Sequence, residues 1–401
     1  MRRELVASLD VGSANTRCIL SEVDGRGELR VAGMCQRHTT GVRKGLIVDV
    51  DACALTIQDT VSSAERMAGA SVGEVYIALS PLHVALQTTR GMVTVLGDKN
   101  TVTKEDVARV VQATKVISLP PNREIVDLVP RQYIVDGYGG LKDPLHMVGM
   151  RLELEATLVV GNLTALSNLR RSVERAGYSA AGFVFKPLAL GELLLGEDER
   201  ELGVQLVDIG AGVTEMAYFE EGILRAVSVV PIGGGNVTND LALGMKVSLH
   251  TAEKLKTEVD WFSLPDDKAF DLQAFGHVES RRVHPRNIID VVEPRLEELL
   301  KLVRHNGQAM SNRDVPSAGV VLTGGATKTK ALAGLAKRHL AGAVRVNLET
   351  YGATDDPGYN VVVATAAYVV SRQRQADERP PGRTSRGLLT RLRGIWQDFW
   401  E

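Results

Sequence analysis

The sequence predicts a two-domain α/β fold, and three observations lead to that prediction. The chain has 401 residues, which is more than one ordinary hydrophobic core organises. A short apolar strand that ends in Asp-x-Gly occurs twice, at 4–12 and at 203–210. After each copy the pattern continues with a second strand, a hairpin turn and a third strand. This internal repeat, at the scale of a domain, indicates two similar halves.

Composition excludes several classes of protein. The chain is 44% hydrophobic and 24% charged, as globular proteins are. Its 47 basic and 49 acidic residues nearly balance, which argues against nucleic acid as a partner. The cysteines Cys18, Cys35 and Cys53 lack C-x-x-C spacing, which excludes a disulfide framework or a zinc site. No apolar run is long enough to span a membrane and no signal-peptide core follows Met1, so the sequence favours a cytoplasmic protein.

The first half begins with strands at 4–11 and 17–23. A helix is predicted over 49–69, where apolar residues recur at helical spacing until Gly69. The segment 74–160 has the pattern of an α+β block inserted into this half, and its helix at about 103–116 opens with a Thr103/Asp106 capping box. The predicted strands here are 75–79, 91–96, 133–135 and 152–160, and helices follow at 163–177 and 186–196.

The second half repeats the strand pattern at 203–209 and 215–219. Predicted helices follow at 236–245, 248–257, 285–305, 328–340 and 359–374, with a strand at 319–323. The segment 373–386 is Pro-rich, charged and aperiodic, which predicts a flexible linker. Residues 387–401 have the pattern of a short amphipathic helix.

The Gly-rich turns predict a phosphate site. Glycine lets backbone N–H groups approach phosphate oxygens, and the turns supply it at positions 12, 210, 212, 324 and 325. Ser13, Asn15 and Thr214 can add side-chain donors. Asp10 and Asp208 would repel a bare phosphate, so they make sense beside Mg²⁺ held through water. Neither a P-loop nor a Gly-x-Gly-x-x-Gly motif competes with this interpretation.

The paired Asp-x-Gly hairpins and the later Thr-Gly-Gly-Ala turn resemble the phosphate and adenosine motifs of the actin, Hsp70 and sugar-kinase superfamily. Within it the chain resembles the FtsA family of bacterial actin-like cell-division proteins. The resemblance covers nearly the whole chain, through segments that include GLIVDV, AERMAG, QYIVDG, RLELEA, DERELGVQLVDIGAGVTE, VVPIGGGNVTNDLA, AEKLK, VVEPRLEELLKLV and VVLTGGA.

The resemblance implies an actin-like two-domain fold with an interdomain nucleotide cleft, an inserted α+β subdomain of the SHS2 type and a C-terminal amphipathic helix. The implied boundaries are 1–80 with 160–200 and about 355–372 for subdomain 1A, 81–159 for the inserted subdomain 1C, 201–235 with 315–354 for subdomain 2A, 236–314 for subdomain 2B, 373–386 for the linker and 387–401 for the helix.

The resemblance also implies how ATP and Mg²⁺ would be held. Gly12, Ser13 and Asn15 would hold the phosphates from one side, and Gly210, Gly212 and Thr214 from the other. Asp10 and Asp208 would position Mg²⁺. The turn of Gly324, Gly325 and Ala326 would back the adenosine, and Glu253 and Lys256 would reach the ribose and base. Spacing alone favours a solvated helix pair for Glu253 and Lys256.

Two departures from the family pattern bear on hydrolysis. The second hairpin reads DIGAGVTE where relatives commonly carry DIGGGTTD, so Ala211 and Glu215 differ. Lys186 stands where many actin-like ATPases have Glu or Gln to orient the attacking water. Because a charged lysine is a poor general base, we expect ATP binding with weak or absent ATPase activity and assign no catalytic residue.

The resemblance implies several partners. The helix at 285–305 would carry the docking surface for the C-terminal tail of FtsZ, the tubulin-like division protein, with Arg295 and Glu298 facing outward. The core-facing stripe of this helix is Val292, Leu296, Leu299, Leu300 and Val303. The plain alternative is an intrahelical ion pair. The inserted subdomain would contact other copies of the chain in a filament, and also later division proteins.

The C-terminal helix predicts a peripheral membrane anchor on the inner face of the cell membrane. An arc of about 140° on a helical wheel contains Leu388, Leu389, Leu392, Ile395, Trp396, Phe399 and Trp400, and it is flanked by Arg391 and Arg393. The segment is too short to span a bilayer but can lie in the interface. From residue 371 the chain carries seven arginines against four acids, which suits an anionic leaflet. A helix that docks in a protein groove is the competing interpretation.

The sequence alone leaves two other functions open. One is a PilM-like role in pilus assembly, which the long linker and amphipathic tail disfavour. The other is a small-molecule kinase of the same superfamily, for which the sequence offers no aspartate base facing a sugar pocket.

Overall fold

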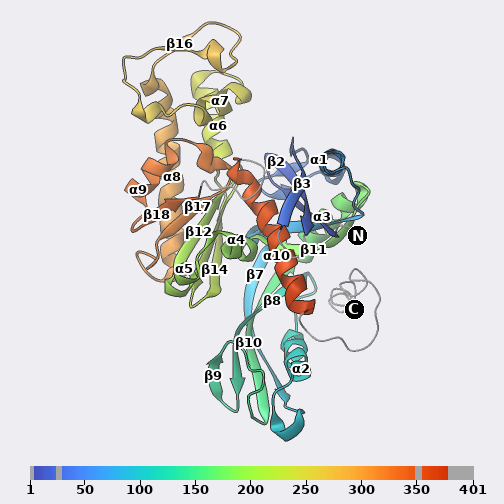
Figure 1. Cartoon of the computed structure of the whole chain (residues 1–401). Coiled ribbons are helices and arrows are strands. Elements are labelled where there is room, and N and C mark those ends of the chain that lie inside the picture. The colour runs from blue at the N-terminus through green and yellow to red at the C-terminus, as the bar shows by residue number, and fades with distance from the viewer. Residues whose placement is uncertain (1–3, 24–28, 348–354, 378–401) are drawn as a thin grey trace.

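The computed structural model describes residues 4–23, 29–347 and 355–377. Figure 1 shows two α/β halves side by side, with a third unit that projects away from the first half. The predicted C-terminal helix and most of the predicted linker lie outside the described residues. No helix in the described ranges is both long and apolar enough to cross a bilayer.

The two halves are built on sheets with the same strand order. In the first, the order is β3 (Leu29–His38), β2 (Asn15–Val23), β1 (Glu4–Val11), β6 (Glu74–Leu79), β11 (Ser179–Phe185). In the second, it is β14 (Ile223–Val230), β13 (Thr214–Glu220), β12 (Val204–Ile209), β17 (Val320–Thr323), β18 (Val344–Val346). The central strands β1 and β12 each pair antiparallel with the next strand and parallel with a later one. The duplication predicted from the Asp-x-Gly hairpins is therefore confirmed.

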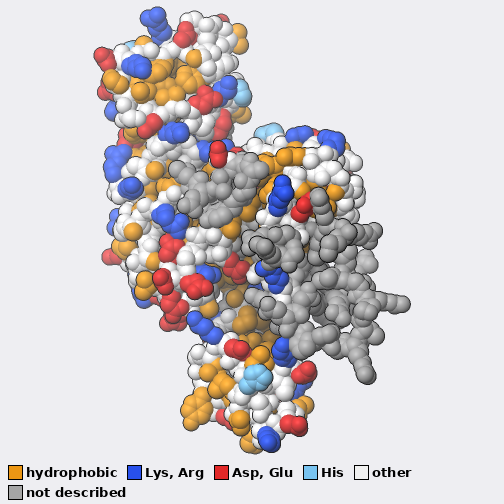
Figure 2. All heavy atoms as spheres, in the orientation of Figure 1, with side chains coloured by type: hydrophobic (Ala, Val, Ile, Leu, Met, Phe, Trp, Pro, Cys, Tyr) orange, Lys and Arg blue, Asp and Glu red, His pale blue; other side chains and the backbone are white. Residues whose placement is uncertain are grey.

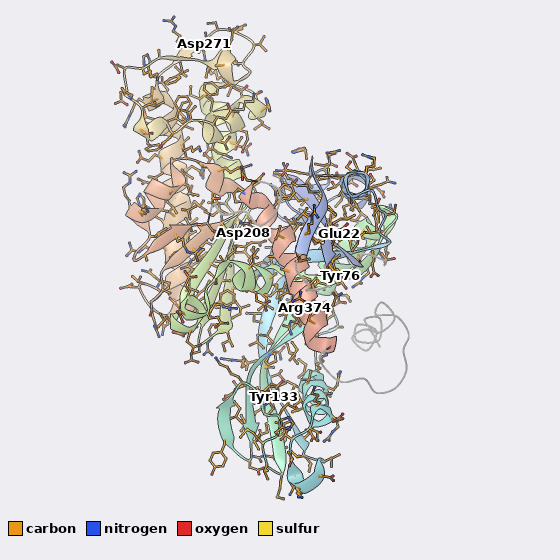
Figure 3. The ribbon with its side chains drawn as sticks, in the orientation of Figure 1. Glu22, Tyr76, Tyr133, Asp208, Asp271 and Arg374 are labelled. Atoms are coloured by element: carbon orange, nitrogen blue, oxygen red, sulfur yellow. The ribbon has the colours of Figure 1, made fainter. Side chains whose placement is uncertain are left out.

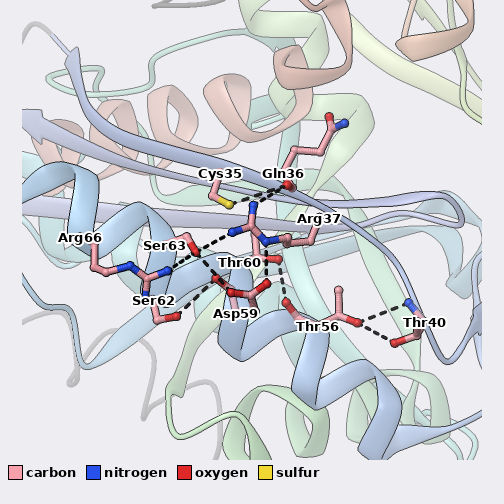
Figure 4. Close-up of polar contacts among 10 residues, drawn as sticks. All are labelled: Cys35, Gln36, Arg37, Thr40, Thr56, Asp59, Thr60, Ser62, Ser63 and Arg66. Atoms are coloured by element: carbon pink, nitrogen blue, oxygen red, sulfur yellow. Dashed lines mark hydrogen bonds and ion pairs between the residues drawn. The ribbon is translucent and has the colours of Figure 1, made fainter.

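Helix α1 (Val50–Ala68) covers the first sheet where the sequence predicts a helix. The Asp49 side chain accepts hydrogen bonds from the N–H groups of Asp51 and Ala52, and Gly69 ends the helix in the left-handed conformation. Arg37 on β3 fastens the helix by donating to Asp59 (2.6 Å) and Ser63 (2.9 Å), as Figure 4 shows. This contact fixes α1 against β3, which pairs with β2, the strand that begins directly after the first Gly-rich turn.

Two helices join the halves. Helix α4 (Lys186–Leu194) follows β11 directly, and α10 (Asn360–Asp377) packs against α4 and β1. Gly191 on α4 lies so close to β13 that a Cβ would be 2.4 Å from the Phe219 ring. Side chains from both sheets therefore share one core around α4.

The inserted unit is an antiparallel sheet with its own core. Its strand order is β7 (Val84–Thr94), β10 (Arg151–Asn162), β8 (Arg123–Val135), β9 (Tyr138–Leu141), and α2 (Lys104–Lys115) covers one face. The predicted capping box is present: Thr103 Oγ1 accepts from the Asp106 N–H (3.2 Å), and Asp106 accepts from the Thr103 N–H (2.9 Å). Figure 2 shows apolar side chains at the surface of this unit.

The second half carries a helical unit over its sheet. It contains α6 (Gly234–Met245), α7 (Leu249–Thr257), α8 (Pro285–Ser311) and a small hairpin of β15 (Phe270–Asp271) and β16 (Arg282–Val283), while α9 (Leu332–His339) lies beside α8. The predicted stripe of α8 is confirmed, since all five of its apolar side chains are buried.

Several boundaries differ from the prediction. Strand β8 is much longer than the predicted 133–135, and it accommodates Pro130 at a register shift where no regular ladder bond is needed. The strands β9 and β11 and the short helix α5 (Glu197–Leu202) were not predicted, and α3 (Leu163–Arg175) ends two residues before the predicted 177. Helix α10 continues to Asp377 and so takes the first residues of the predicted linker, because Arg, Gln and Ala are good helix formers.

Candidate functional site

A cavity of about 920 Å³ lies between the two halves. Its wall is formed by the turn between β1 and β2, the turn between β12 and β13, the start of α6 and the Gly-Gly turn after β17. Figure 3 places Asp208, at the end of β12, where the halves face each other. Segments that are far apart in the sequence therefore meet at one site.

The cavity brings together twelve of the thirteen residues predicted to bind nucleotide. These are Asp10, Gly12, Ser13, Asn15, Asp208, Gly210, Gly212, Glu253, Lys256, Gly324, Gly325 and Ala326. Thr214 is the exception, because its side chain is fully buried and its hydroxyl donates to the Ile232 carbonyl (2.8 Å). Its predicted role as a phosphate donor is corrected: Thr214 ties β13 to the loop before α6.

The two hairpin turns touch each other across the cavity. A Cβ at Gly212 would lie 2.6 Å from Ser13 Oγ, so only glycine allows this approach. Ser13 Oγ accepts a hydrogen bond from the Gly45 N–H (2.9 Å), and the Gly45 carbonyl accepts from His83 Nε2 (3.0 Å). The first turn is therefore held by a chain of contacts that reaches into the start of the inserted unit.

The start of α6 was not identified as part of the site from the sequence. Gly234 and Gly235 line the cavity, and their N–H groups donate to the carbonyls of Gly210 and Ala211 (2.8 Å each). A Cβ at Gly233 would lie 2.5 Å from the Gly210 oxygen. The Gly-Gly-Gly run directly before a predicted helix was the available signal, since such runs allow close backbone approach.

Three buried carboxylates and one buried ammonium form what we call the acid cluster: Asp10, Asp208, Glu215 and Lys186. Lys186 Nζ lies 2.8 Å from Asp10 Oδ1 and 3.9 Å from Glu215 Oε1. Burial, followed by the negative charge of Glu215, raises the pKa of Asp208 to about 7. Burial alone would lower the pKa of Lys186, but Asp10, Glu215 and Asp208 together raise it above its usual value. The ammonium is therefore charged.

The acid cluster fits a hydrated divalent cation. Its donors are carboxylate oxygens, which Mg²⁺ prefers, and Glu215 Oε2 is buried without a hydrogen-bond partner. The carboxylates also outnumber the ammonium, so negative charge remains to be balanced. In the ranges that the structure describes, no three His, Cys, Asp or Glu side chains are grouped as direct metal ligands.

Glu253 and Lys256 on α7 are only half of the solvated pair that their spacing favoured, because the Glu253 side chain is 49% exposed but that of Lys256 is buried. Lys256 Nζ is buried and donates to Glu253 (2.7 Å), to Thr238 Oγ1 (2.9 Å) and to the Gly234 carbonyl (3.2 Å). Burial lowers the pKa of Lys256. Tertiary packing of α6 against α7 removes this lysine from water and places it at the cavity wall.

Arg17 is a further cavity residue, which was not predicted from the sequence. It lies opposite Asp10 in the β1–β2 ladder, donates to Gln36 (2.7 Å) and lies over the Tyr359 ring at 5.6 Å. It lies in β2, just beyond the first Gly-rich turn, and the motif of that turn does not include it.

Arg295 and Glu298 lie on α8, outside the cavity lining. The Arg295 side chain is 30% exposed and Glu298 49%, so the expectation that both face outward holds better for Glu298. Arg295 pairs with Asp240 on α6 (2.5 Å) as well as with Glu298. The pair is thus more than an intrahelical one, because it links α8 to α6.

Comparison with known proteins places these features in a family. A family model described as "SHS2 domain inserted in FTSA" matches residues 82–160, and one described as "Cell division protein FtsA" matches 205–364. Cell division protein FtsA of Bacillus subtilis is 35% identical over 374 residues, which are 92% of this chain and 84% of that protein. The FtsA protein of Streptococcus pneumoniae is 31% identical over 92% of this chain and 80% of its own length. That of Escherichia coli is also 31% identical, over 91% of this chain and 90% of its own length.

Solved structures show the same fold at lower identity. The PilM–PilN type IV pilus biogenesis complex matches with a TM-score of 0.61 and 20% identity, over 92% of this chain and 99% of that chain. MreB 5 of Spiroplasma citri bound to AMPPNP matches with a TM-score of 0.54 and 13% identity, over 94% of this chain and 99% of that chain. The two-domain architecture predicted from the duplicated hairpin is therefore the actin-like fold.

Proposed function

Because this chain belongs to the FtsA family of cell-division proteins, we propose that it binds ATP between its two halves, assembles with itself and tethers FtsZ to the inner face of the cell membrane. The main observation that supports the proposal is the cavity itself. Four separate Gly-rich or acidic segments line it, and twelve residues expected at a nucleotide line its wall.

The phosphates of ATP would lie between the two hairpin turns. Gly12, Ser13 and Asn15 would contact them from the first half, and Gly210 and Gly212 from the second. The turn from Gly324 to Ala326 would back the adenosine, with Glu253 and Lys256 near the ribose and base. The AMPPNP-bound neighbour of the same fold supports a nucleotide as the ligand.

Asp10 and Asp208 would hold Mg²⁺ through water, together with Glu215, whose Oε2 is buried without a hydrogen-bond partner. When bound, the ion would neutralise phosphate charge. Lys186 occupies the position from which a Glu or Gln would orient water, and its charged ammonium cannot accept a proton. We therefore propose slow or absent hydrolysis, so that ATP acts mainly as a ligand that joins the halves.

Self-assembly would use the inserted unit. Tyr138, Val148 and Met150 are large apolar side chains that are exposed on it. Exposed apolar groups of this kind are typical of a contact surface. Contacts between unlike surfaces of identical chains do not close and produce filaments. The same unit would contact later division proteins.

FtsZ would bind through its C-terminal tail at α8, near Arg295 and Glu298. The amphipathic segment 387–401 would attach the protein to an anionic membrane surface, after a linker that begins beyond Asp377. A PilM-like role is the alternative suggested by fold, but the family models and the curated relatives favour cell division.

The deciding experiment is calorimetric titration of ATP with Mg²⁺ into the full-length protein and into Asp208→Ala. We expect the wild type to bind and the variant to lose at least about tenfold in affinity, or 1.4 kcal/mol. Unchanged affinity in the variant would reject the site. A wild type that binds no nucleotide would reject ATP as the ligand.

A further inference from the structure

A small hairpin of β4 (Val42–Arg43) and β5 (Leu46–Ile47) forms part of the cavity wall. Arg43 pairs with Leu46, so the tip of the hairpin consists of Lys44 and Gly45 alone. Both tip residues have a positive φ, +49° at Lys44 and +76° at Gly45. This conformation at both central positions is typical of the tight type I′ turn. The turn therefore places Lys44 at the cavity.

Lysine is an unusual residue for the first position of such a turn. The left-handed region favours Gly, Asn and Asp, because a larger side chain is strained there. Residues that are held in this region by their surroundings concentrate at ligand sites. Lys44 thus occupies a position for which turn geometry alone favours another residue.

The tip of the hairpin contacts both phosphate turns. In the first turn, Ser13 Oγ accepts from the Gly45 N–H (2.9 Å). Because Ser13 Oγ is the acceptor in this bond, its own proton can still be donated to a phosphate oxygen. In the second turn, a Cβ at Gly212 would lie 3.2 Å from Lys44 Cα. Lys44 therefore lies where the two turns converge.

The charges of this hairpin differ from the other positive charges of the cavity wall. Each of the other Lys and Arg side chains there pairs with a carboxylate; these are Arg17, Lys186, Lys256 and Lys328. Arg43 and Lys44 are exposed, and among the residues that the structure describes neither forms an ion pair with an acid. The ammonium of Lys44 is therefore available to an anionic ligand.

The proposed path of the nucleotide ends at this hairpin. The wall proposed for adenosine belongs to the second half, where a Cβ at Gly234 would lie 2.7 Å from Ala326 Cβ and 3.6 Å from Lys256 Nζ. The hairpin belongs to the first half and contacts Ser13. A phosphate chain that starts at the adenosine wall and passes between the two turns therefore has its last phosphate nearest the hairpin.

A purely structural role explains Lys44 less well. The hydrogen bonds that hold the tip to Ser13 and to His83 are made by the backbone of Gly45. Glycine or asparagine at position 44 would keep these bonds and would remove the backbone strain. The lysine side chain is thus not needed to form or anchor the turn.

We propose that Lys44 is a specificity-determining residue whose ammonium contacts the terminal phosphate of the bound nucleotide. The hairpin tip then makes the site prefer a nucleoside triphosphate to a diphosphate, because a charge-assisted bond to the last phosphate is lost with that phosphate. This inference rests on the proposed nucleotide binding. It concerns affinity and involves no covalent step.

The test is calorimetric titration of ATP and, separately, of ADP into the full-length protein, both with Mg²⁺. The wild type should bind ATP more tightly than ADP by at least about tenfold, or 1.4 kcal/mol. Lys44→Gln and Lys44→Gly should each lower the affinity for ATP by about tenfold and that for ADP by less than about twofold. Lys44→Gly also removes the backbone strain, so it should fold at least as well as the wild type. Lys44→Arg keeps the charge and should keep most of the preference for ATP.

Lys99 is the matched control. It is an exposed lysine outside the cavity lining, and its φ of +56° is in the same left-handed region as that of Lys44. Lys99→Gln and Lys99→Gly therefore make the same changes in charge and backbone strain at a distance from the site. Both should bind ATP and ADP as the wild type does.

The outcomes separate this inference from the proposed function. Equal affinities of the wild type for ATP and ADP would overturn the role of Lys44 and leave the nucleotide site intact. Unchanged ATP affinity in Lys44→Gln and Lys44→Gly, or equal losses for ATP and ADP, would also overturn it. A wild type that binds neither nucleotide would reject the proposed function itself. Thermal unfolding of each variant checks the fold.

Discussion

Gly324 passes directly over the carboxylate of Asp208. The two residues end neighbouring parallel strands, β17 and β12, and a Cβ at Gly324 would lie only 2.1 Å from Asp208 Oδ1. Gly324 also has a φ of +93°, in the region that favours glycine. The turn that would support adenosine and the acid that would position the metal ion are therefore packed as one unit.

We expect Gly324→Ala to lower the free energy of unfolding by about 1–3 kcal/mol, because it adds both backbone strain and a clash with Asp208. Urea denaturation measures this loss, and ATP titration should show weakened binding. Gly334→Ala on α9 is the control: nothing lies within 4 Å of the added Cβ, so stability should be unchanged or higher by about 0.5–1 kcal/mol. Equal effects at both positions would contradict the interpretation.

The lowered pKa of His83 predicts that the folded protein loses stability in mild acid. Burial, aided by the charge of Lys186, lowers its pKa in the folded protein, although the Gly45 carbonyl opposes the shift. The unfolded chain therefore binds more protons, and stability falls as the pH drops below about 6.5, by at most about 1.4 kcal/mol per pH unit. Unfolding free energies at pH 5.5 and 7.5 should differ more in the wild type than in His83→Gln. His305→Gln, at an exposed position, should retain the wild-type difference.

Tyr368 connects α10 to the inserted unit. Its hydroxyl donates to Asp127 on β8 (2.9 Å) and accepts from Arg372 (2.6 Å), and the ring is buried. Tyr368→Phe should cost about 1 kcal/mol in stability, because the partly buried carboxylate of Asp127 loses one donor and Arg372 loses an acceptor. Hydrogen exchange should also show less protection of α10. Tyr138→Phe, at an exposed tyrosine of the inserted unit, should leave both measurements unchanged.

Arg295 should matter for both docking and local packing. Peptide titration followed by fluorescence anisotropy should show that Arg295→Ala weakens binding of the FtsZ tail by about tenfold, or 1.4 kcal/mol. ATP affinity should not change, because Arg295 lies outside the cavity lining. Lys301→Ala removes another cation from α8 and controls for charge alone. Tail binding equal to that of the wild type in Arg295→Ala would move the docking surface elsewhere.

The C-terminal segment should be necessary for membrane attachment and dispensable for ATP binding. Deletion of 387–401, or replacement of Trp396 and Phe399 by Glu, should abolish flotation with anionic liposomes, because it removes apolar surface from the interface. The same proteins should bind ATP as the wild type does. Flotation that survives the deletion would show that the attachment lies in another part of the chain.

The sequence by itself determined the features that depend on near neighbours in the chain. The 3.6-residue spacing and the Asp49 and Gly69 caps define α1, and apolar spacing defines the buried stripe of α8. The repeated Asp-x-Gly turn gave the duplicated halves, because a strand that ends in a glycine turn is a local pattern. The same local chemistry identified the residues of the phosphate turns that line the cavity.

Only the tertiary structure decided which of these residues meet. Thr214 follows the glycine turn in sequence, but its side chain points to Ile232 and away from the cavity. Lys256 has the spacing of a surface residue, but packing of α6 on α7 buries it against Gly234. Lys186 pairs with Asp10 across a large sequence separation, because α10, α4 and β1 pack together. Contacts of this kind depend on how whole elements dock, and no local period or turn pattern encodes that docking.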